Sequence, residues 1–393
     1  MKSSLPSAAF LVAAALTVSR VWGAAITPGD LVIYRVGTDG NTGLNSAATA
    51  AFVDEYTQGG VRVQSIAMPT IANGSNKILT ASGTASSEGM LTCSPDGAYV
   101  ALTGYNAALG TSKVASSTSA AVSRTVGIIS AADSSVDTST SLTDAFDGNN
   151  IRGATTIDGT NIWVSGASSS NKTAGVRYVT KGASNSTQLS STVTNIVGVA
   201  IYGGQLYASD STGSSYRLST IGSGLPETSG QTMANLPGFL TATGSPNAFF
   251  FADLSSDVAG VDTLYVADDS AGMLKYSLVG GSWVSNGTVG AGSDNYRGLT
   301  GMVDSDGTTV DLFATRKGGT GATGGGELVS LIDSSGYNGA FSGTPMLLAT
   351  ASANESFRGI ALIVPEPASI SLLALGGMAL LSHIRGRASS QRI

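Results

Sequence analysis

One pattern recurs along the sequence and restricts the fold more than any other feature. Each copy has a glycine at the start of an apolar segment, then a turn with Asp-Gly or Gly-Gly, then a second segment that ends in small residues. The four complete copies begin at Ser87 (SEGMLTCSPDGAYVALTG), Asn150 (NIRGATTIDGTNIWVSG), Asn195 (NIVGVAIYGGQLYASD) and Asn295 (NYRGLTGMVDSDGTTVDLFAT). Such a turn between two apolar runs predicts a β-hairpin. The chain is therefore expected to consist of repeated hairpins.

Two further segments extend the series. NAFFFADL and VDTLYVAD, within 247–268, form a divergent copy with a longer turn, and SFRGIALIV from Ser356 is a first strand with no partner after it. The copies are about 45 to 65 residues apart. This interval suits a four-stranded propeller blade with loop insertions.

The two ends of the series complement each other. DLVIYRVG, AAFVDEYTQGG and VRVQSIAMPT near the N-terminus are strands without a first strand before them. Joining them to FRGIALI predicts an all-β fold, a six-bladed β-propeller closed by N- and C-terminal strands. Such closure removes the exposed sheet edges that favour aggregation. A seven-bladed ring, a pair of β-sandwiches and a β-solenoid are the alternatives.

The single cysteine and the single histidine exclude several kinds of active site. Cys93 has no partner for an intrachain disulfide, and its place in an expected strand favours packing over a reactive thiol. His383 lies close to the C-terminus, so the body of the chain lacks histidine. Catalytic Ser-His and Cys-His pairs and histidine-ligated metals are therefore not expected. The sequence predicts no catalytic residue, no metal and no cofactor.

The charge pattern argues against a nucleic-acid partner. Charged residues make up 12% of the chain, and the formal net charge is -6. Several of the basic residues lie at the two ends, so the body between them is acidic. Binding to phosphates needs clustered lysine or arginine, and an acidic body does not provide it.

Both ends of the chain have the pattern of targeting segments. Residues 1–23 combine a basic start, the apolar run AAFLVAAALTV and small residues, which predicts a signal peptide cut by signal peptidase after Gly23, or alternatively after Ala25. Near the other end, residues 368–382 form a mainly apolar run that is interrupted by Gly376 and Gly377. This run is short for a membrane helix, which needs about 20 residues. Arginines follow it, and positive residues stay on the cytoplasmic side of a membrane.

The C-terminal pattern resembles a known sorting signal. Pro365-Glu366-Pro367, the apolar run and then Arg385 and Arg387 together resemble the PEP-CTERM signal of Gram-negative bacteria. The resemblance implies recognition by an exosortase, a membrane transpeptidase-like enzyme, while the hydrophobic helix holds the precursor transiently in the inner membrane. It further implies removal of the tail and delivery of the body to the cell surface or the exopolysaccharide matrix. An ordinary C-terminal anchor is the alternative.

The sequence thus divides into three parts. Residues 1–23 are the expected signal peptide, 24–364 the propeller-like body, and 365–393 the sorting signal with its motif, transmembrane helix and basic tail.

The repeat also singles out charged residues. Three copies have an arginine directly before the opening glycine (Arg152, Arg297 and Arg358), and the first copy has Glu88 there. Because the first strand of each propeller blade lines the central channel, these side chains are expected at one mouth of it. They can bind a carboxylate, a sulfate or an acidic sugar. Alternatively, each arginine bonds loop carbonyls of the neighbouring blade, which is the interpretation we favour.

Two acidic loops have the composition, but not the spacing, of calcium sites. DAFDGNN contains Asp144 and Asp147, and DSDG contains Asp304 and Asp306. Neither has the ligand spacing of a helix-flanked calcium loop. Asp-Gly turns explain both loops.

Three functions follow from these observations. The first is a non-enzymatic surface or matrix protein, a scaffold or binding module that contacts exopolysaccharide. The second is a lyase or hydrolase of acidic polysaccharide that acts at the channel mouth, although Glu88 is the only acid among the candidate residues for the general base. The third is a module that binds small anions or glycans through the same arginines.

Overall fold

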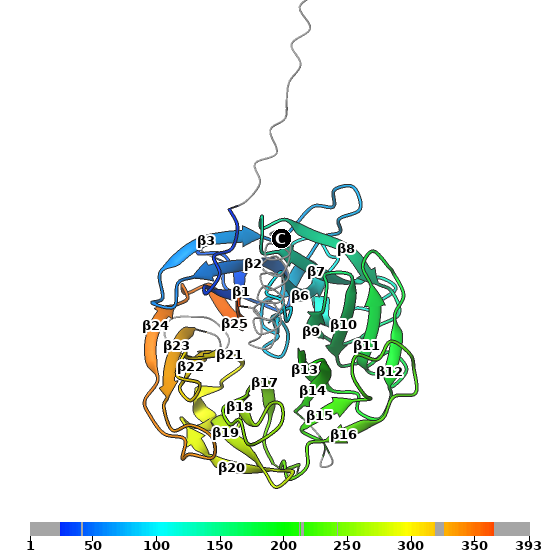
Figure 1. Cartoon of the computed structure of the whole chain (residues 1–393). Coiled ribbons are helices and arrows are strands. Elements are labelled where there is room, and N and C mark those ends of the chain that lie inside the picture. The colour runs from blue at the N-terminus through cyan, green and yellow to red at the C-terminus, as the bar shows by residue number, and fades with distance from the viewer. Residues whose placement is uncertain are drawn as a thin grey trace, which may run out of the picture.

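The computed structural model describes residues 24–364, except positions 41, 212, 214, 215, 242 and 319–325. In this part of the chain the regular structure is β-strand apart from two single-turn 3-10 helices, η1 (Val114–Ser116) and η2 (Gly292–Asp294). The strands form antiparallel sheets arranged in a ring around a common axis (Figure 1). The prediction of an all-β, propeller-like body is confirmed. Among the residues described, no helix is long enough and apolar enough to cross a membrane.

Four of the sheets have four strands each, connected in sequence order, and Figure 1 shows their first strands nearest the axis. The first two sheets consist of β9 (Ile151–Thr156), β10 (Asn161–Gly166), β11 (Gly175–Thr180) and β12 (Thr187–Ser190), then β13 (Ile196–Tyr202), β14 (Gln205–Asp210), β15 (Leu218–Ile221) and β16 (Met233–Asn235). The other two consist of β17 (Pro246–Ala252), β18 (Thr263–Asp268), β19 (Gly272–Val279) and β20 (Ser282–Val289), then β21 (Gly298–Val303), β22 (Val310–Arg316), β23 (Glu327–Asp333) and β24 (Met346–Thr350). Each repeat predicted from the sequence after residue 140 thus begins one sheet.

The remaining strands form one nine-stranded sheet with two parts. The first part, here called the closing sheet, has the order β25 (Glu355–Leu362), β1 (Leu31–Gly37), β2 (Ala48–Tyr56) and β3 (Arg62–Ala67). The second part contains β5 (Thr92–Cys93), β6 (Tyr99–Tyr105), β7 (Arg124–Ser130) and β8 (Val136–Leu142). β4 (Thr80–Ser82) pairs with both β2 and β6 and so connects the two parts.

The closing sheet joins the two ends of the described chain. β1 pairs antiparallel with β25, with Leu31 opposite Leu362 and Val36 opposite Ser356. All seven residues of β1 are buried, because neighbouring sheets cover both faces of the strand. The predicted pairing of an N-terminal strand with FRGIALI is therefore confirmed.

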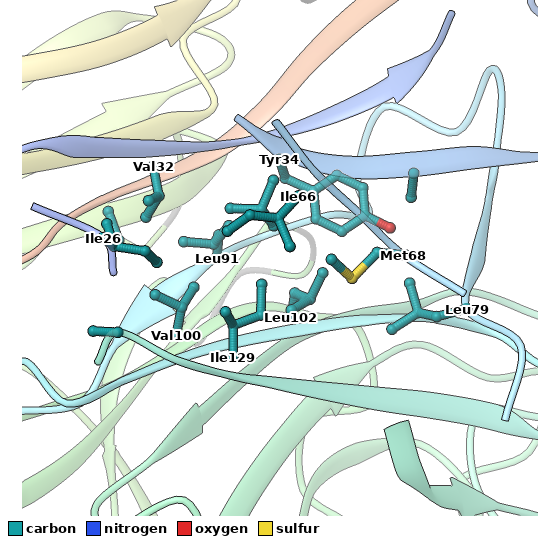
Figure 2. Close-up of a cluster of buried hydrophobic side chains, with 14 of the residues drawn as sticks. Ile26, Val32, Tyr34, Ile66, Met68, Leu79, Leu91, Val100, Leu102 and Ile129 are labelled. Atoms are coloured by element: carbon teal, nitrogen blue, oxygen red, sulfur yellow. The ribbon is translucent and has the colours of Figure 1, made fainter. Parts of the chain in front are cut away.

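The alternation of side chains in β1 explains this burial. Val32 and Tyr34 point into one apolar cluster with Leu91, Leu102 and Ile129 of the second part of the sheet (Figure 2). The alternate residues of β1 pack instead with side chains of β22 and β23. A strand buried on both faces reads as a nearly continuous apolar run, as LVIYRV does apart from Arg35. Full burial of one such side chain stabilises the fold by about 1.5 to 3 kcal/mol.

The opening glycine of the repeat has a steric cause. A Cβ atom on Gly198 would lie 2.6 Å from the carbonyl oxygen of Asn247 in the next sheet. A Cβ on Gly359 would lie 2.6 Å from the carbonyl oxygen of Gly89 and would also overlap the backbone nitrogen of Leu91. Inner strands of adjacent sheets therefore approach so closely at the axis that only glycine fits there.

Candidate functional site

The four charged residues singled out by the repeat are all buried at the inner strands. Glu88, Arg152, Arg297 and Arg358 have exposed fractions of 3%, 7%, 7% and 1%. Arg152 lies in β9 and Arg358 in β25. Arg297 directly precedes Gly298, at which β21 begins, whereas Glu88 lies in the loop before β5. Glu88 and Arg358 come together: a Cβ atom on Gly89, the residue after Glu88, would lie 3.0 Å from Cβ of Arg358. Each charge opposes the shift that burial causes in the pKa of the other.

Glu88 is held by three donors from its surroundings. One carboxylate oxygen accepts a hydrogen bond from the backbone nitrogen of Ser82 at 2.5 Å. The other accepts from Tyr105 Oη at 2.8 Å and from Asn150 Nδ2 at 2.9 Å. Burial raises the pKa of Glu88, while these donors and Arg358 oppose the rise. The carboxyl group thus connects the loop before β5 to β6 and to the start of β9.

Two of the arginines hold the loop formed by residues 83–88. Arg358 donates from Nη1 to the carbonyl oxygen of Ala85 and from Nη2 to that of Gly83 at 3.1 Å. Arg297 donates from Nη1 to the carbonyl oxygen of Ser86 at 2.5 Å. These contacts agree with the favoured interpretation, in which the arginines bond loop carbonyls of a neighbouring blade.

Arg152 points toward a different part of the ring. Its Nη1 donates to the carbonyl oxygen of Ile196 at 3.3 Å, in the next sheet. Burial lowers the pKa of Arg152 to about 10, and Tyr105, Asp210 and Glu88 oppose this shift. Burial also lowers the pKa of Arg358 to about 10. Both side chains remain cations near neutral pH.

One chemical feature is shared by the three arginines. The Nε atoms of Arg152, Arg297 and Arg358 are buried and have no hydrogen-bond acceptor within the described structure. A buried donor without an acceptor costs about 1 to 3 kcal/mol, and more when it is charged. Each of the three guanidinium groups thus donates at least one hydrogen bond from an outer nitrogen, while its Nε stays unmatched.

The sequence analysis missed a set of hydroxyl groups that connect the sheets. Ser209 Oγ in β14 accepts from the Gly198 backbone nitrogen at 2.8 Å and donates to the Asn247 carbonyl oxygen of the next sheet at 2.7 Å. Ser165 and Thr315, in the second strands of their sheets, likewise donate to a carbonyl of the next sheet. The signal was present, because WVSG, YASD and FATR place a hydroxyl residue at one common position.

A cavity of about 640 Å³ lies on the axis between the inner strands. Its lining includes segments of β5, β13, β17, β21 and β25. Apolar residues of these strands and of the segment before β5 line it, among them Met90, Val199, Ile201, Phe250, Leu299 and Ile360. The lining of β21 and β25 begins at the glycines that directly follow Arg297 and Arg358. Arg297, just before β21, and Arg358, within β25, are therefore next to the residues at which the cavity lining starts.

Cys93 also lines this cavity. The side chain is partly buried and packs against the apolar cluster of Figure 2. Burial, with a smaller contribution from Asp96, raises the pKa of Cys93 to about 12. The thiol is therefore neutral near pH 7, in agreement with the predicted packing role, since reactive thiols have lowered pKa values.

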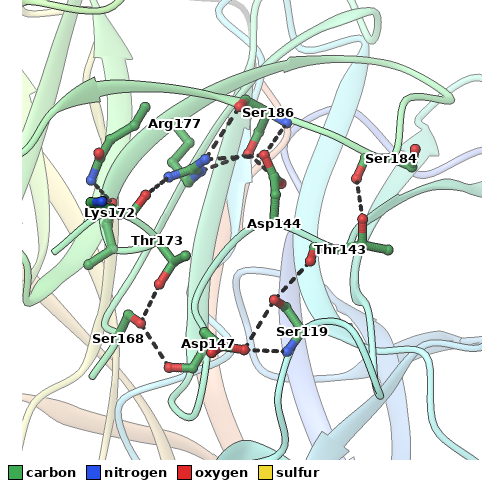
Figure 3. Close-up of polar contacts among 12 residues, drawn as sticks. Ser119, Thr143, Asp144, Asp147, Ser168, Lys172, Thr173, Arg177, Ser184 and Ser186 are labelled. Carbon is green, nitrogen blue, oxygen red and sulfur yellow. Dashed lines mark hydrogen bonds and ion pairs between the residues drawn. The ribbon is translucent and has the colours of Figure 1, made fainter. Parts of the chain in front are cut away.

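The acidic loop DAFDGNN holds neighbouring loops together (Figure 3). Asp144 Oδ2 accepts from the backbone nitrogen of Ser186 at 2.9 Å and from Arg177 Nη2 at 3.2 Å. Asp147 Oδ1 accepts from the backbone nitrogen of Ser119 at 2.7 Å. Both aspartates thus make structural contacts, as expected from a turn rather than from a calcium site.

The second acidic loop behaves in the same way. Asp306 Oδ1 accepts from the backbone nitrogens of Thr308 and Thr309, both at 2.8 Å. These bonds stabilise the carboxylate and lower the pKa of Asp306 to about 2. In the described part of the chain, no three acidic, histidine or cysteine side chains gather in a way that could hold a metal ion.

The predicted sorting residues lie outside the described residues. This holds for Pro365, Glu366, Pro367, Arg385 and Arg387, and equally for the predicted signal peptide at 1–23. Their roles stay predictions from the sequence.

No protein-family model matches this sequence, and no curated protein does. Solved structures are similar at low identity. The periplasmic gluconolactonase PpgL of Pseudomonas aeruginosa has 14% identity and a TM-score of 0.44, covering 82% of this chain and 83% of its own. A putative 6-phosphogluconolactonase of Bacteroides fragilis has 13% identity and a TM-score of 0.43, covering 82% of each chain. A chain of the nidogen/laminin complex has 11% identity and a TM-score of 0.47, covering 86% of this chain and 99% of its own.

Proposed function

We propose that this chain is an exported protein of the cell surface or exopolysaccharide matrix whose body is a non-enzymatic binding module. The observation that carries the proposal is the axial cavity of about 640 Å³. A cavity of this size with a mainly apolar lining is typical of small-molecule sites. In the same proposal, the closing sheet and the strands β5–β8 count as separate blades connected by β4, which gives a six-bladed ring.

The lining indicates an uncharged and largely apolar ligand. Ile201, Leu299 and Ile360 bring apolar atoms from three different inner strands, and Met90 brings them from the segment before β5. The Cys93 thiol in the same wall has a pKa raised to about 12, so it adds no charge near neutral pH. Charged ligands would lose their hydration in such surroundings. Among the described residues of the lining, Asp253 is the one that is charged, so anions in particular would gain no counter-charge.

An uncharged dye tests the cavity directly. N-phenyl-1-naphthylamine fluoresces more strongly in apolar surroundings, and we expect it to bind the protein saturably. The bound dye should also slow the reaction of Cys93 with a maleimide, a readout that is specific because the chain has one cysteine. Absence of both saturation and protection would contradict a ligand site in the cavity.

A pair of variants localises the dye. Thr300→Trp adds an indole to a residue that lines the cavity, and we expect it to weaken dye binding at least about tenfold. Ser285→Trp adds the same group to an exposed position of the outer strand β20 and serves as the control. Equal effects of the two variants would place the dye elsewhere.

The enzyme alternative has one observation in its favour. Burial raises the pKa of Glu88, as is common for general acids and bases. Against it, both carboxylate oxygens already accept hydrogen bonds from the protein. Incubation with acidic polysaccharides decides between the two: turnover that is abolished in Glu88→Gln would establish an enzyme. Under the binding proposal, neither protein turns the polymer over.

Export and sorting form the second half of the proposal. Signal peptidase would remove residues 1–23, and an exosortase-type enzyme would read Pro365-Glu366-Pro367 and remove the tail with Arg385 and Arg387. The flanking prolines favour an extended segment that an enzyme cleft can bind. Mass spectrometry of the mature protein from its host tests this. A mature surface protein that still ends at Ile393 would indicate an ordinary anchor.

A further inference from the structure

Arg297 and Arg358 come from neighbouring sheets and meet at one loop. Arg358 donates to the carbonyl oxygens of Gly83 and Ala85, and Arg297 donates to that of Ser86. Nη1 of Arg358 and Nη1 of Arg297 thus donate to carbonyls of two adjacent residues, Ala85 and Ser86, and the charge of Arg297 adds to burial in lowering the pKa of Arg358. The loop therefore holds two like charges side by side in a buried place.

Each of these arginines keeps one donor that no protein group accepts. The Nε atoms of Arg297 and Arg358 are buried and lack an acceptor, although the side chains are 93% and 99% covered. The nearby carboxylates do not take these protons. Glu88 accepts from three other donors, and Asp269 Oδ1 lies 3.5 Å from Nη2 of Arg297, not from its Nε.

A small oxyanion has the acceptor oxygens that the Nε–H groups of Arg297 and Arg358 lack. Guanidinium groups bind carboxylate and sulfate through charge-assisted hydrogen bonds, with two oxygens able to accept from two donors at once. An anion between the guanidinium groups would also reduce the repulsion between them. The loop residues Thr84, Ala85, Ser86 and Ser87 are only half-buried, so a single loop separates the pair from solvent.

We infer that Arg297 and Arg358 form a binding site for a small oxyanion, a carboxylate or a sulfate, whose oxygens accept hydrogen bonds from their two Nε–H groups. The carboxylate can belong to a free anion or to a uronate unit of an acidic glycan. This site is separate from the apolar cavity, and each can exist without the other.

Arg152 provides an internal control. It occupies the same repeat position, is buried to the same extent as Arg297, and also has an unmatched Nε. However, its guanidinium points to the carbonyl oxygen of Ile196, whereas the other two meet at residues 83–86. A pair-specific site therefore predicts no anion effect at Arg152.

The test follows the Nε–Hε resonances of the ¹⁵N-labelled full-length protein during titration at constant ionic strength. Acetate, sulfate and an oligouronate are the three titrants. We expect saturable shifts of the Arg297 and Arg358 signals, assigned by Arg297→Lys and Arg358→Lys, and none for Arg152. Each of these lysine variants should weaken binding about tenfold or more, and Arg152→Lys by less than twofold.

The outcomes separate the sources of the anion. Saturation by acetate or sulfate alone supports a free small anion, and saturation by the oligouronate as well supports a glycan. If neither signal shifts, or if both drift without saturation together with the exposed Arg62, the anion is adventitious and the inference is wrong. If Arg358→Lys does not fold, Arg297→Lys still assigns the Arg297 signal, and the presence or absence of a saturable shift of that signal decides the inference.

Discussion

The closing sheet and the sheet formed by β17–β20 are both four-stranded parts of the ring, but different interactions stabilise them. In β17–β20, successive strands follow one another within one stretch of chain. Short turns join β18 to β19 and β19 to β20, whereas residues 253–262 form a longer connection between β17 and β18. In the closing sheet, β1 and β25 pair although more than 300 residues separate them. A hairpin turn fixes the register of the strands it joins. No turn does so for β1 and β25.

A buried ionic group fixes the register of the closing sheet instead. Arg35 Nε in β1 lies 2.5 Å from Asp54 Oδ2 in β2, and Arg35 Nη1 lies 2.8 Å from Glu355 Oε1 in β25. The guanidinium also donates to the Gly37 carbonyl oxygen. All three charged side chains are at least 90% covered. Directional bonds of this kind are possible in only one register.

Aromatic packing dominates in β17–β20. The ring of Phe251 lies 5.3 Å from that of Tyr202, 4.6 Å from Tyr207 and 5.5 Å from Trp283, between centroids. Such contacts contribute about 0.5 to 1.5 kcal/mol each beyond the burial of area, but they tolerate small displacements. The comparison teaches that directional charge pairs occur where the chain connectivity leaves the register open.

Deleting β1, residues 31–37, should have the largest effect. It removes seven buried residues and leaves β2 and β25 with unpaired edges. We expect the protein to lose its cooperative thermal transition in circular dichroism. Replacing the exposed residues 71–75 by a Gly-Ser linker of equal length is the control. A deletion variant that melts at the temperature of the intact protein would show that end-to-end closure is not needed for folding.

Arg35→Met should be the next most damaging change. It leaves Asp54 and Glu355 buried without their shared cation, which costs about 3 to 5 kcal/mol in comparable buried pairs. Urea denaturation measures the change in the free energy of unfolding.

Arg62→Met is the matched control for Arg35. The Arg62 side chain is 52% exposed and lies 3.8 Å from the same Asp54, and an exposed pair contributes at most about 1 kcal/mol. Equal effects of the two substitutions would mean that the buried group does not stabilise the closing sheet.

Phe251→Leu should have a smaller effect in the other sheet. The substitution keeps an apolar side chain but removes the ring contacts with Tyr207 and Trp283, so we expect a loss of about 1 to 2 kcal/mol. The register of β18, β19 and β20 should not change, because short turns between these strands define it. Amide hydrogen exchange measures this: altered protection along β18 and β19 would contradict the distinction between the two sheets.

The sequence allowed more of the fold to be predicted than of the site. Asp-Gly turns and apolar runs are local signals, so the sheets and the pairing of FRGIALI with the N-terminal strands could be predicted. The arginines could be placed at the inner strands because they precede the repeated glycine. That Arg297 and Arg358 meet at one loop while Arg152 points elsewhere could not, because it depends on loop 83–88 folding over the ends of other sheets. The cavity likewise depends on the spacing between five strands distant in sequence.

The smallest expected effect is a pH dependence of stability that arises just before β1 of the closing sheet. Asp30 precedes β1, and burial together with the neighbouring Glu55 raises its pKa from 3.8 to about 6. The folded protein therefore holds this proton more tightly than the unfolded chain does. It follows that the contribution of Asp30 to stability is favourable near pH 4 and is lost as the pH rises to about 6.

Asp30→Asn keeps the backbone hydrogen bond from the Ile363 nitrogen to the carbonyl oxygen of residue 30 and removes the charge. We expect this variant to be more stable than the wild type at pH 7, by less than about 1 kcal/mol because the site is partly exposed, and no more stable at pH 4. Urea denaturation of both proteins at the two pH values measures the difference. If the stability difference between the two proteins does not change with pH, Glu55 does not raise the pKa of Asp30. The polar contacts of the closing sheet would then be limited to the group around Arg35.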